Sequence, residues 1–190
     1  MMDKKVTLKY RPVQQKDYAL LRQFRVECGW GIPKLDNHWL DPDWPLCVFY
    51  TETDDGQDEV GMGGWVLDMP EDQDAASRAL RNVHLTSLYI QHRYRGAQLG
   101  TQALAMLEIG AKEQFDARYV TLMTTAYHTD WNGEHWVENV ASPSRSSLWY
   151  KGKGYEEFRP RTAGILSPIP ENPDRTMMSV WMRKGVEQPS

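Results

Sequence analysis

The sequence is short of cysteine, of positive charge and of long apolar runs, and each shortage excludes a class of protein. Its two cysteines, Cys28 and Cys47, are too few for a disulfide framework and belong to no metal-ligand motif. We interpret both as buried thiols in a reducing compartment. A formal net charge of −4 argues against nucleic acid as a partner, because phosphate binding needs clustered Lys and Arg. Neither a membrane-spanning run nor the apolar core of a signal peptide is found, so we expect a cytoplasmic protein, with the nucleus as a second compartment.

What is present is the composition of an ordinary globular protein. The 190 residues are 41% hydrophobic and 25% charged, and a chain of this length can bury a sizeable core. We expect one domain over residues 1–190.

Hydrophobic periodicity and turn signals predict an irregular alternation of strands and helices. Strands are predicted at residues 6–13, 46–52, 60–69, 82–90, 118–124, 154–159 and 176–184. Helices are predicted at residues 17–28, 70–80, 99–112 and 144–151. Loops are predicted at residues 29–45, 125–143 and 162–174. This order indicates a mixed α/β (α+β) fold.

At one junction a predicted strand ends in "HRYRGAQLG" and an amphipathic helix follows. Such a junction collects unpaired backbone N–H groups at the positive end of the helix dipole, which suits a phosphate or pyrophosphate. Gly96 and Gly100 would let the backbone approach the anion, Arg95 would add a charge-assisted contact, and Thr101 would supply a hydroxyl. The lysine of a P-loop is missing, and the glycine spacing differs from that of the dinucleotide fingerprint. A turn that uses glycine only for its shape, or one that holds another phosphate ligand, is the alternative.

A second motif, "WYKGKGY" at residues 149–155, lies downstream. Together the two segments resemble the GNAT superfamily of acyl-CoA-dependent N-acetyltransferases. The first family motif, Arg/Gln-x-x-Gly-x-Gly/Ala, corresponds to residues 95–100, and the second resembles Leu-Tyr-x-x-x-Gly-Phe. The likeness spans residues 6–184 in element order, although specific motifs cover only about thirty residues of it. Gln98 stands where the family usually has glycine, and Pro143 and Ser144 replace an Asn often found near the start of the next helix. The glucosamine-phosphate acetyltransferases resemble this chain in having Gln at the position of Gln98.

The resemblance implies a single GNAT-like domain, with a central, mostly antiparallel twisted sheet of about seven strands flanked by about four helices. It implies acetyl-CoA as cosubstrate and no metal. The strand before the turn would hold the pantetheine arm through its main chain and direct one N–H at the thioester carbonyl. The predicted CoA-binding residues are Leu88, Tyr89, Ile90, Arg95, Gly96, Ala97, Gln98, Leu99, Gly100, Thr101 and Ser144.

Two residues are candidates for proton transfer. Tyr150 matches the family tyrosine that protonates the leaving thiolate, and a phenol is protonated at neutral pH. Many relatives carry a Glu base two residues before the position of Leu88, where this chain has Thr86. Strand alternation would place His84 on one face with Thr86, Leu88 and Ile90, which makes His84 a candidate base. A strand histidine bonded to a neighbour is the alternative.

The segment at residues 125–143 is rich in aromatic and acidic side chains. These suit a cationic amine through cation–π contacts and charge attraction, and the segment follows a strand that usually borders the acceptor site. The loop at residues 29–45 is of similar character and contains Trp30, Asp36, Trp39, Asp41, Asp43 and Trp44. The predicted substrate-binding residues are Trp30, Tyr127, Asp130, Trp131, Glu134 and Trp136. A solvated loop anchored by tryptophans is the alternative. A metal site at His128 and His135 is not favoured, because their spacing matches no known ligand set.

The function that these patterns favour is an acetyl-CoA-dependent N-acetyltransferase, an acyltransferase that acts by direct transfer in a ternary complex. The acceptor would be a primary amine, and the acidic aromatic segments favour a small cation. A protein or peptide acceptor, and a non-catalytic acyl-CoA-binding regulatory module, remain open, as does a homodimer.

Overall fold

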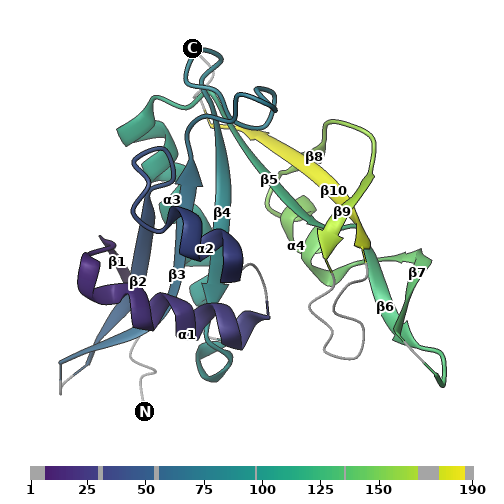
Figure 1. Cartoon of the computed structure of the whole chain (residues 1–190), viewed down its shortest axis with the longest axis horizontal. Helices are drawn as coiled ribbons and strands as arrows, with labels where there is room; N and C mark the ends of the chain where they lie inside the picture. The colour runs from purple at the N-terminus through teal and green to yellow at the C-terminus, as the bar shows by residue number, and fades with distance from the viewer. Residues whose placement is uncertain are drawn as a thin grey trace. The chain divides into compact units, whose positions relative to one another are not determined.

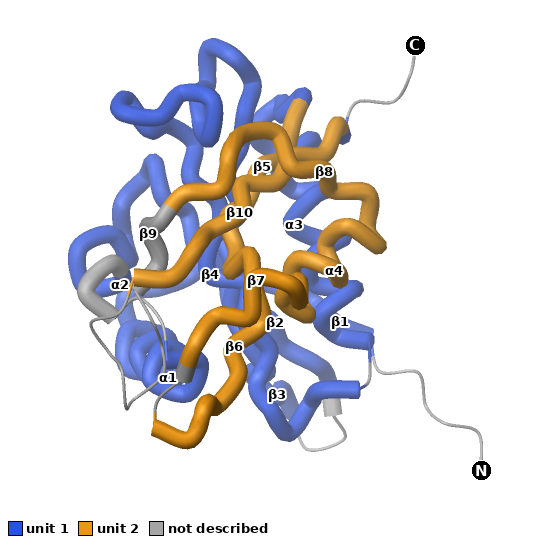
Figure 2. Tube along the Cα trace, turned by 90° about the vertical axis from the view of Figure 1, so that its right-hand side faces the viewer, with its two compact units in different colours: residues 1–118, 186–190 blue, residues 119–185 orange. Residues whose placement is uncertain are grey.

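In the computed structural model of the chain, the described residues are 7–29, 32–53, 56–96, 98–134, 136–166 and 176–186. The chain divides into two compact units, residues 1–118 with 186–190 and residues 119–185 (Figure 2). Unit 1 carries the predicted phosphate turn, and unit 2 carries Tyr150 and the acidic aromatic segment.

Four antiparallel strands form the sheet of unit 1 and pair in chain order (Figure 1). They are β1 (Leu8–Pro12), β2 (Leu46–Thr53), β3 (Gly56–Val66) and β4 (Asn82–Ile90). All four were predicted within a few residues. The strands β2 and β3 follow one another in the chain and pair antiparallel, as the two strands of a hairpin do.

Helices cover both faces of this sheet. On one face lie α1 (Tyr18–Cys28), which follows the short 3-10 helix η1 (Gln15–Asp17), and α2 (Ile32–His38). The residues of that core are Leu21, Phe24, Leu35, Leu46, Val48, Met62 and Tyr89. On the other face lies α3 (Leu99–Phe115), where Trp65 Nε1 donates to the carbonyl of Leu107 at 2.9 Å. Gly110 permits this contact, because a Cβ there would lie 2.7 Å from the Trp65 ring.

The ends of α1 explain its position in the sequence. Before it, Asp17 accepts two hydrogen bonds from the Arg11 guanidinium, at 2.6 and 3.0 Å, which ties the helix start to β1. After it, Gly29 adopts a left-handed φ of 75° and donates its N–H to the carbonyls of Arg25 and Val26. Glycine reaches this conformation without a steric penalty, so the helix ends there.

A β-bulge interrupts β4. Tyr89 pairs with Met62 and Thr86 pairs with Gly64, so the residues between, Ser87 and Leu88, both oppose a single residue of β3. Ser87 has a φ of 63°, in the left-handed region. An extra residue on one strand bends it and increases its twist.

The bulge overturns one prediction about the strand. Because the extra residue reverses the alternation, His84 and Thr86 share a face with Tyr89, and Ile90 lies on the opposite face. The prediction that His84, Thr86, Leu88 and Ile90 line one face is therefore wrong.

Unit 2 is built around its last strand. β10 (Thr176–Gly185) pairs antiparallel with β5 (Tyr119–Thr125) on one side and with β8 (Glu156–Glu157) and β9 (Thr162–Leu166) on the other. The predicted helix at residues 144–151 is α4 (Arg145–Lys151), which contacts β5. A separate hairpin pairs β6 (Tyr127–Trp131) with β7 (Trp136–Pro143).

Several predicted element boundaries are wrong for local reasons. Residues 70–80 form turns instead of a helix, because Asp72 and Ser77 side chains accept hydrogen bonds from the nearby N–H groups of Ala75 and Leu80. Residues 125–143 form a hairpin instead of a loop, and the first part of the predicted loop at 162–174 is β9. The strand predicted at residues 154–159 pairs only over Glu156–Glu157.

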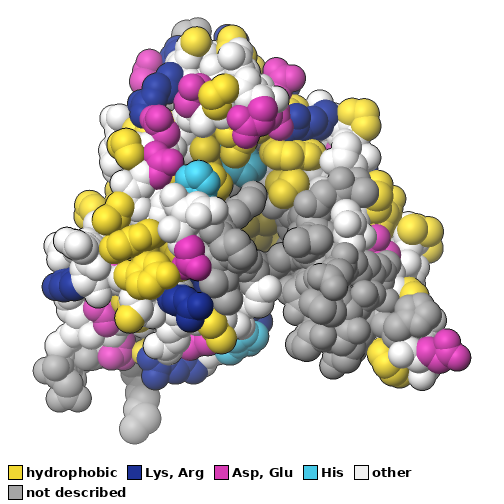
Figure 3. Space-filling view, in the orientation of Figure 1, with side chains coloured by type: hydrophobic (Ala, Val, Ile, Leu, Met, Phe, Trp, Pro, Cys, Tyr) yellow, Lys and Arg dark blue, Asp and Glu magenta, His cyan; other side chains and the backbone are white. Residues whose placement is uncertain are grey.

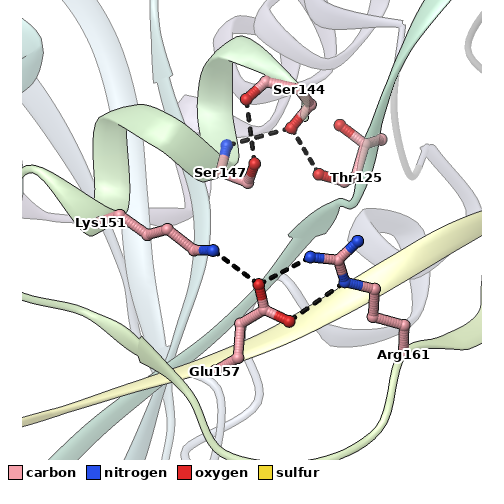
Figure 4. Close-up of polar contacts among 6 residues, drawn as sticks. All are labelled: Thr125, Ser144, Ser147, Lys151, Glu157 and Arg161. Carbon is pink, nitrogen blue, oxygen red and sulfur yellow. Dashed lines mark hydrogen bonds and ion pairs between the residues drawn. The ribbon is translucent and has the colours of Figure 1, made fainter. Parts of the chain in front are cut away.

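Glu157 links three elements of unit 2 (Figure 4). Lys151 Nζ lies 2.7 Å from its Oε1, and the Arg161 Nε and Nη2 atoms donate to the carboxylate at 3.1 and 2.8 Å. The hydrogen bonds from Arg161, and then that from Lys151, lower the pKa of Glu157 to about 2. Helix α4 is thereby tied to β8 and to Arg161, the residue just before β9.

We expect Glu157→Gln to lower the free energy of unfolding by about 0.5–1 kcal/mol at neutral pH, because partly exposed ion pairs contribute little more. The folded pKa lies below the ordinary value of 4.5, so the stabilisation is complete above that pH and disappears as the pH falls towards about 2. Urea denaturation of the variant and the native chain at about pH 7 and pH 3 checks this. The control is Glu156→Gln, at the adjacent exposed carboxylate. A difference of the same size at both pH values would contradict the assignment.

Candidate functional site

The predicted phosphate turn joins β4 to α3 within unit 1. The chain leaves β4 at Gln91, passes through the short 3-10 helix η2 (His92–Tyr94), and reaches Arg95 and Gly96, both exposed. α3 then begins at Leu99, which is buried and anchors the helix start. The first N–H groups of this long helix point along its axis toward the turn, where an anion is stabilised by both hydrogen bonding and the helix dipole.

The two glycines of the turn face open space. A Cβ built on Gly96 or on Gly100 would have no other atom within 4 Å, and Gly96 has a φ of 93°. Gly96 is therefore needed for its backbone conformation, whereas Gly100 is in an ordinary helical conformation with room above it. A phosphate can reach the amides here without displacing a side chain.

Gln98 shows why glycine is the usual residue at its position. It is the N-cap of α3 and adopts a left-handed φ of 57°, and its carbonyl accepts hydrogen bonds from Thr101 and Gln102. Glycine adopts this conformation freely, and a residue with a Cβ does so at a cost. The departure from the family motif thus keeps the backbone shape that glycine provides. Ala97 lies outside the described residues.

A hydrogen-bonded network that the sequence patterns did not predict holds the chain just before the turn. The Glu27 carboxylate accepts from Gln91 Nε2 at 3.1 Å and from Tyr89 Oη at 3.1 Å. Gln91, which is buried, accepts from Arg93 through its Oε1 at 3.2 Å. A depression of about 380 Å³ is lined by Gln23, Glu27, Gln91, His92 and Arg93. Hydrogen bonds from Gln23, Gln91 and Tyr89 lower the pKa of Glu27, so it accepts as a carboxylate.

The strand residues predicted to contact CoA differ in what their side chains do. The Tyr89 ring packs with Phe24 of α1, and burial, with the Glu27 bond, raises the pKa of its phenol to about 12. Ile90 is buried and Leu88 lies in the bulge, half-exposed. Only the main chain of these residues can therefore serve a ligand in the predicted way. His84 is 7% exposed within the strand, and its role as a base remains a prediction.

Ser144 and Tyr150 belong to α4 in unit 2. The Ser144 hydroxyl caps the helix by accepting from the N–H of Ser147 at 3.0 Å, and it donates to the carbonyl of Thr125 at 2.5 Å (Figure 4). These contacts give Ser144 a structural role, and its contact with CoA remains a prediction. The Tyr150 ring packs edge-on against Trp149 and Tyr155, and burial raises the pKa of its phenol to about 12. Tyr150 therefore stays protonated well above neutral pH, as an acid must.

The β6–β7 hairpin brings most of the predicted substrate residues together. Asp130 accepts from Asn139 Nδ2 at 2.8 Å and lies 3.4 Å from His128 Nε2. Trp131, 50% exposed, and Glu134 stand at the tip, where acidic and hydrophobic side chains are visible in Figure 3. The backbone of Trp136 pairs with Trp131 across the hairpin, but the side chain of Trp136 is outside the described part of the structure. Trp30 lies wholly outside the described residues.

Some acidic and aromatic residues have partners within the chain. The Tyr127 ring is covered by the Arg161 guanidinium at 5.0 Å. In the segment at residues 29–45, Asp36 accepts from Tyr18 Oη at 2.6 Å, Asp41 lies 3.1 Å from His38, and Asp43 accepts from Arg78 at 2.7 Å. These contacts favour the alternative of an anchored loop for residues 29–45, and they leave the hairpin tip as the stronger candidate for the acceptor.

Among the residues that the structure describes, no group of three or more His, Cys, Asp or Glu side chains could hold a metal ion. None of the helices in this part of the chain is long and apolar enough to cross a membrane.

Neither a family model nor a curated protein matches the sequence. Solved structures do match. The chain is similar to spermidine/spermine N-acetyltransferase SpeG of Vibrio cholerae, with a TM-score of 0.61 and 12% identity over 94% of this chain and 92% of that one. It is similar to a ribosomal-protein alanine N-acetyltransferase of Escherichia coli, with a TM-score of 0.62 and 10% identity over 97% of each chain. A GNAT-family acetyltransferase of Staphylococcus aureus gives a TM-score of 0.58 and 13% identity over 95% of this chain and all of that one (100%). At these identities the likeness is one of fold, over nearly the whole chain.

Proposed function

We propose that this chain, which has the GNAT fold that its motifs predicted, is an acetyl-CoA-dependent N-acetyltransferase acting on a small cationic amine. The observation that carries the proposal is the turn between β4 and α3. There, open space above Gly96 and Gly100 exposes the amides of a helix N-terminus, next to the exposed Arg95. One of the solved structures of this fold, the spermidine N-acetyltransferase of Vibrio cholerae with CoA and spermine, has a TM-score of 0.62 to this chain.

Acetyl-CoA fits what the turn and its strand offer. Its pyrophosphate suits the N–H groups of α3 and the guanidinium of Arg95, because both are donors to an anion. Its pantetheine arm carries amides that suit the main chain of β4. The bulge at Ser87 and Leu88 disturbs the pairing with β3, which frees backbone N–H groups for a ligand. One of these would stabilise the negative charge that develops on the thioester oxygen.

Proton transfer falls to Tyr150 in this proposal. As the thioester breaks, its phenol gives a proton to the sulfur of the leaving thiolate, and the amine attacks directly, without a covalent enzyme intermediate. A raised pKa keeps the phenol protonated at the pH where the amine is increasingly neutral. His84 is the proposed base, acting directly or through water.

The choice of a cationic acceptor rests on the hairpin. Residues 127–143 contain Asp130, Glu134 and Glu138 and no Lys or Arg. Glu138 accepts from the N–H of Met178 at 3.0 Å. The Asp130 carboxylate is bonded to Asn139 but its side chain is 47% exposed, and it lies with the exposed Glu134 on the same hairpin as the exposed Trp131 ring, so these two carboxylates are the ones that a cationic substrate could reach. Solved structures of a polyamine acetyltransferase and of a ribosomal-protein acetyltransferase match this fold equally well. The choice between these acceptor classes therefore rests on the hairpin residues and not on the fold.

We expect Asp130→Asn to raise the KM for spermidine about 3–5-fold, because an exposed charge pair contributes up to about 1 kcal/mol. The KM for acetyl-CoA should not change, and added salt should reduce the difference, since screening weakens the same attraction. Thiol release at two salt concentrations measures all three. The control is Glu113→Gln, at an exposed carboxylate on α3 in unit 1. An equal rise with an uncharged amine such as benzylamine at high pH would show that Asp130 acts through the hairpin structure and not through its charge.

A further inference from the structure

The last turn of α1 holds β4 on both sides of Leu88. On one side, an Nη atom of Arg25 donates to the hydroxyl of Ser87. On the other, the Glu27 carboxylate accepts from Tyr89 Oη and from Gln91 Nε2. One short stretch of helix thus contacts three of the five residues from Ser87 to Gln91. The partners are 62 or 64 positions apart in the sequence.

Arg25 is an unusual residue for this position. It is 9% exposed, on the face of α1 that packs against the sheet, beside Leu21 and Phe24. Burial of a guanidinium is unfavourable unless it gains hydrogen bonds, and here burial lowers the pKa of Arg25. An apolar side chain could fill the same space in the core. The presence of arginine there therefore indicates a role for its hydrogen bond to Ser87.

The residue that Arg25 holds is the one that shapes the bulge. Ser87 has a left-handed φ of 63°, which is unfavourable for a residue with a Cβ and persists only when the surroundings impose it. Its hydroxyl lies between Arg25 and the hydroxyl of Thr86, 3.2 Å away. Serine itself has no strong preference for the left-handed conformation, so the hydrogen bonds of its side chain must stabilise it.

We infer that Arg25 is a positioning residue for acetyl transfer: it holds Ser87 in the left-handed conformation and so fixes the bulge that presents the main chain at Leu88 to the thioester. The inference rests on the proposed function. The thioester oxygen needs a donor whose direction is set before the reaction, and a bulge that relaxes would turn that N–H away. Arg25 touches neither substrate in this account and acts only through Ser87.

The test uses glycine at position 87, because glycine adopts a positive φ without help. Arg25→Met keeps the apolar length of the side chain and removes the bond. We expect kcat to fall about 10-fold, which corresponds to about 1.4 kcal/mol in the barrier, with the KM for acetyl-CoA within about twofold of the native value. Ser87→Ala should have the same effect, since it removes the acceptor and keeps the Cβ. The double variant Arg25→Met/Ser87→Gly should recover most of the lost kcat.

A second readout does not depend on turnover. Hydrogen–deuterium exchange measured by mass spectrometry should be faster in the peptide that covers residues 86–90 in Arg25→Met, and slow again in the double variant. Arg22→Met, at an exposed arginine on the same helix, is the control for both measurements. A native chain that turns over no amine would refute the proposed function. The exchange data would still test whether Arg25 fixes the bulge at Ser87. Unchanged kcat in Arg25→Met and Ser87→Ala, or a double variant no better than Arg25→Met, would overturn the inference.

Discussion

Replacement of Gly100 by leucine is expected to raise the KM for acetyl-CoA about 10–100-fold without destabilising the protein. The new side chain would occupy the open space above the first turn of α3, where nothing lies within 4 Å of a Cβ. The pyrophosphate would lose one charge-assisted hydrogen bond, which contributes about 1.5–3 kcal/mol. Leucine has a higher helix propensity than glycine, so stability should hold or increase by up to about 1 kcal/mol.

Weaker acetyl-CoA binding together with unchanged or higher stability would show that Gly100 lies at the pyrophosphate site and is not needed for folding. Calorimetric titration with acetyl-CoA and thermal denaturation, on the same samples, measure both. Ala105→Leu, at an exposed position further along α3, adds a similar side chain away from the turn and should leave the affinity unchanged. If Gly100→Leu binds acetyl-CoA as tightly as the native chain, the pyrophosphate does not lie at this turn.

Tyr150→Phe is expected to lower kcat about 10–100-fold while the KM for acetyl-CoA stays nearly constant, because the hydroxyl acts on the leaving thiolate and not on the bound cosubstrate. The ring contacts with Trp149 and Tyr155 need no hydroxyl, so the variant should fold normally. Since burial raises the pKa of Tyr150 to about 12, kcat of the native chain should rise with pH as the amine deprotonates and show no fall up to about pH 10.

Steady-state kinetics between pH 6 and 10 for the native chain and the variant provide the comparison. Tyr119→Phe, in β5 of the same unit, is the matched control, because its ring is held by Arg183 at 4.6 Å. A rate for Tyr150→Phe equal to that of the native chain would remove Tyr150 from the acid role. In that case the thiolate would leave without protein assistance.

Local patterns in the sequence predicted the parts of the site that depend on neighbouring residues. The turn and α3 follow from glycine spacing and one apolar helical face, and both are present as predicted. The helix predicted at residues 70–80 failed because its Asp and Ser side chains compete for backbone groups, which periodicity does not register. The hairpin at residues 127–143 was missed because Asp, Asn, Gly and Pro recur along it, and these residues are more typical of loops than of strands.

The parts that depend on distant contacts could not be read from the sequence. Thr86, Ser87 and Leu88 resemble an ordinary strand, yet one of them is in a left-handed conformation that contact with α1 stabilises. Arg25 and Glu27 form no motif with anything near them in sequence. Likewise, nothing local shows that Asp36 is bonded to Tyr18 or that Asp43 is bonded to Arg78.

The measurement that tests the account most directly is thiol release from acetyl-CoA across a panel of amines, on a chain whose CoA binding has first been confirmed by calorimetry. The panel contains spermidine, tryptamine, glucosamine 6-phosphate, an aminoglycoside and a lysine peptide. We predict that the chain binds CoA and acetylates amines, fastest with a small polycationic amine, and that salt slows this turnover. Tight CoA binding with no turnover on any amine would contradict the enzyme and leave a binding module. No binding of CoA at all would contradict the assignment of the turn itself.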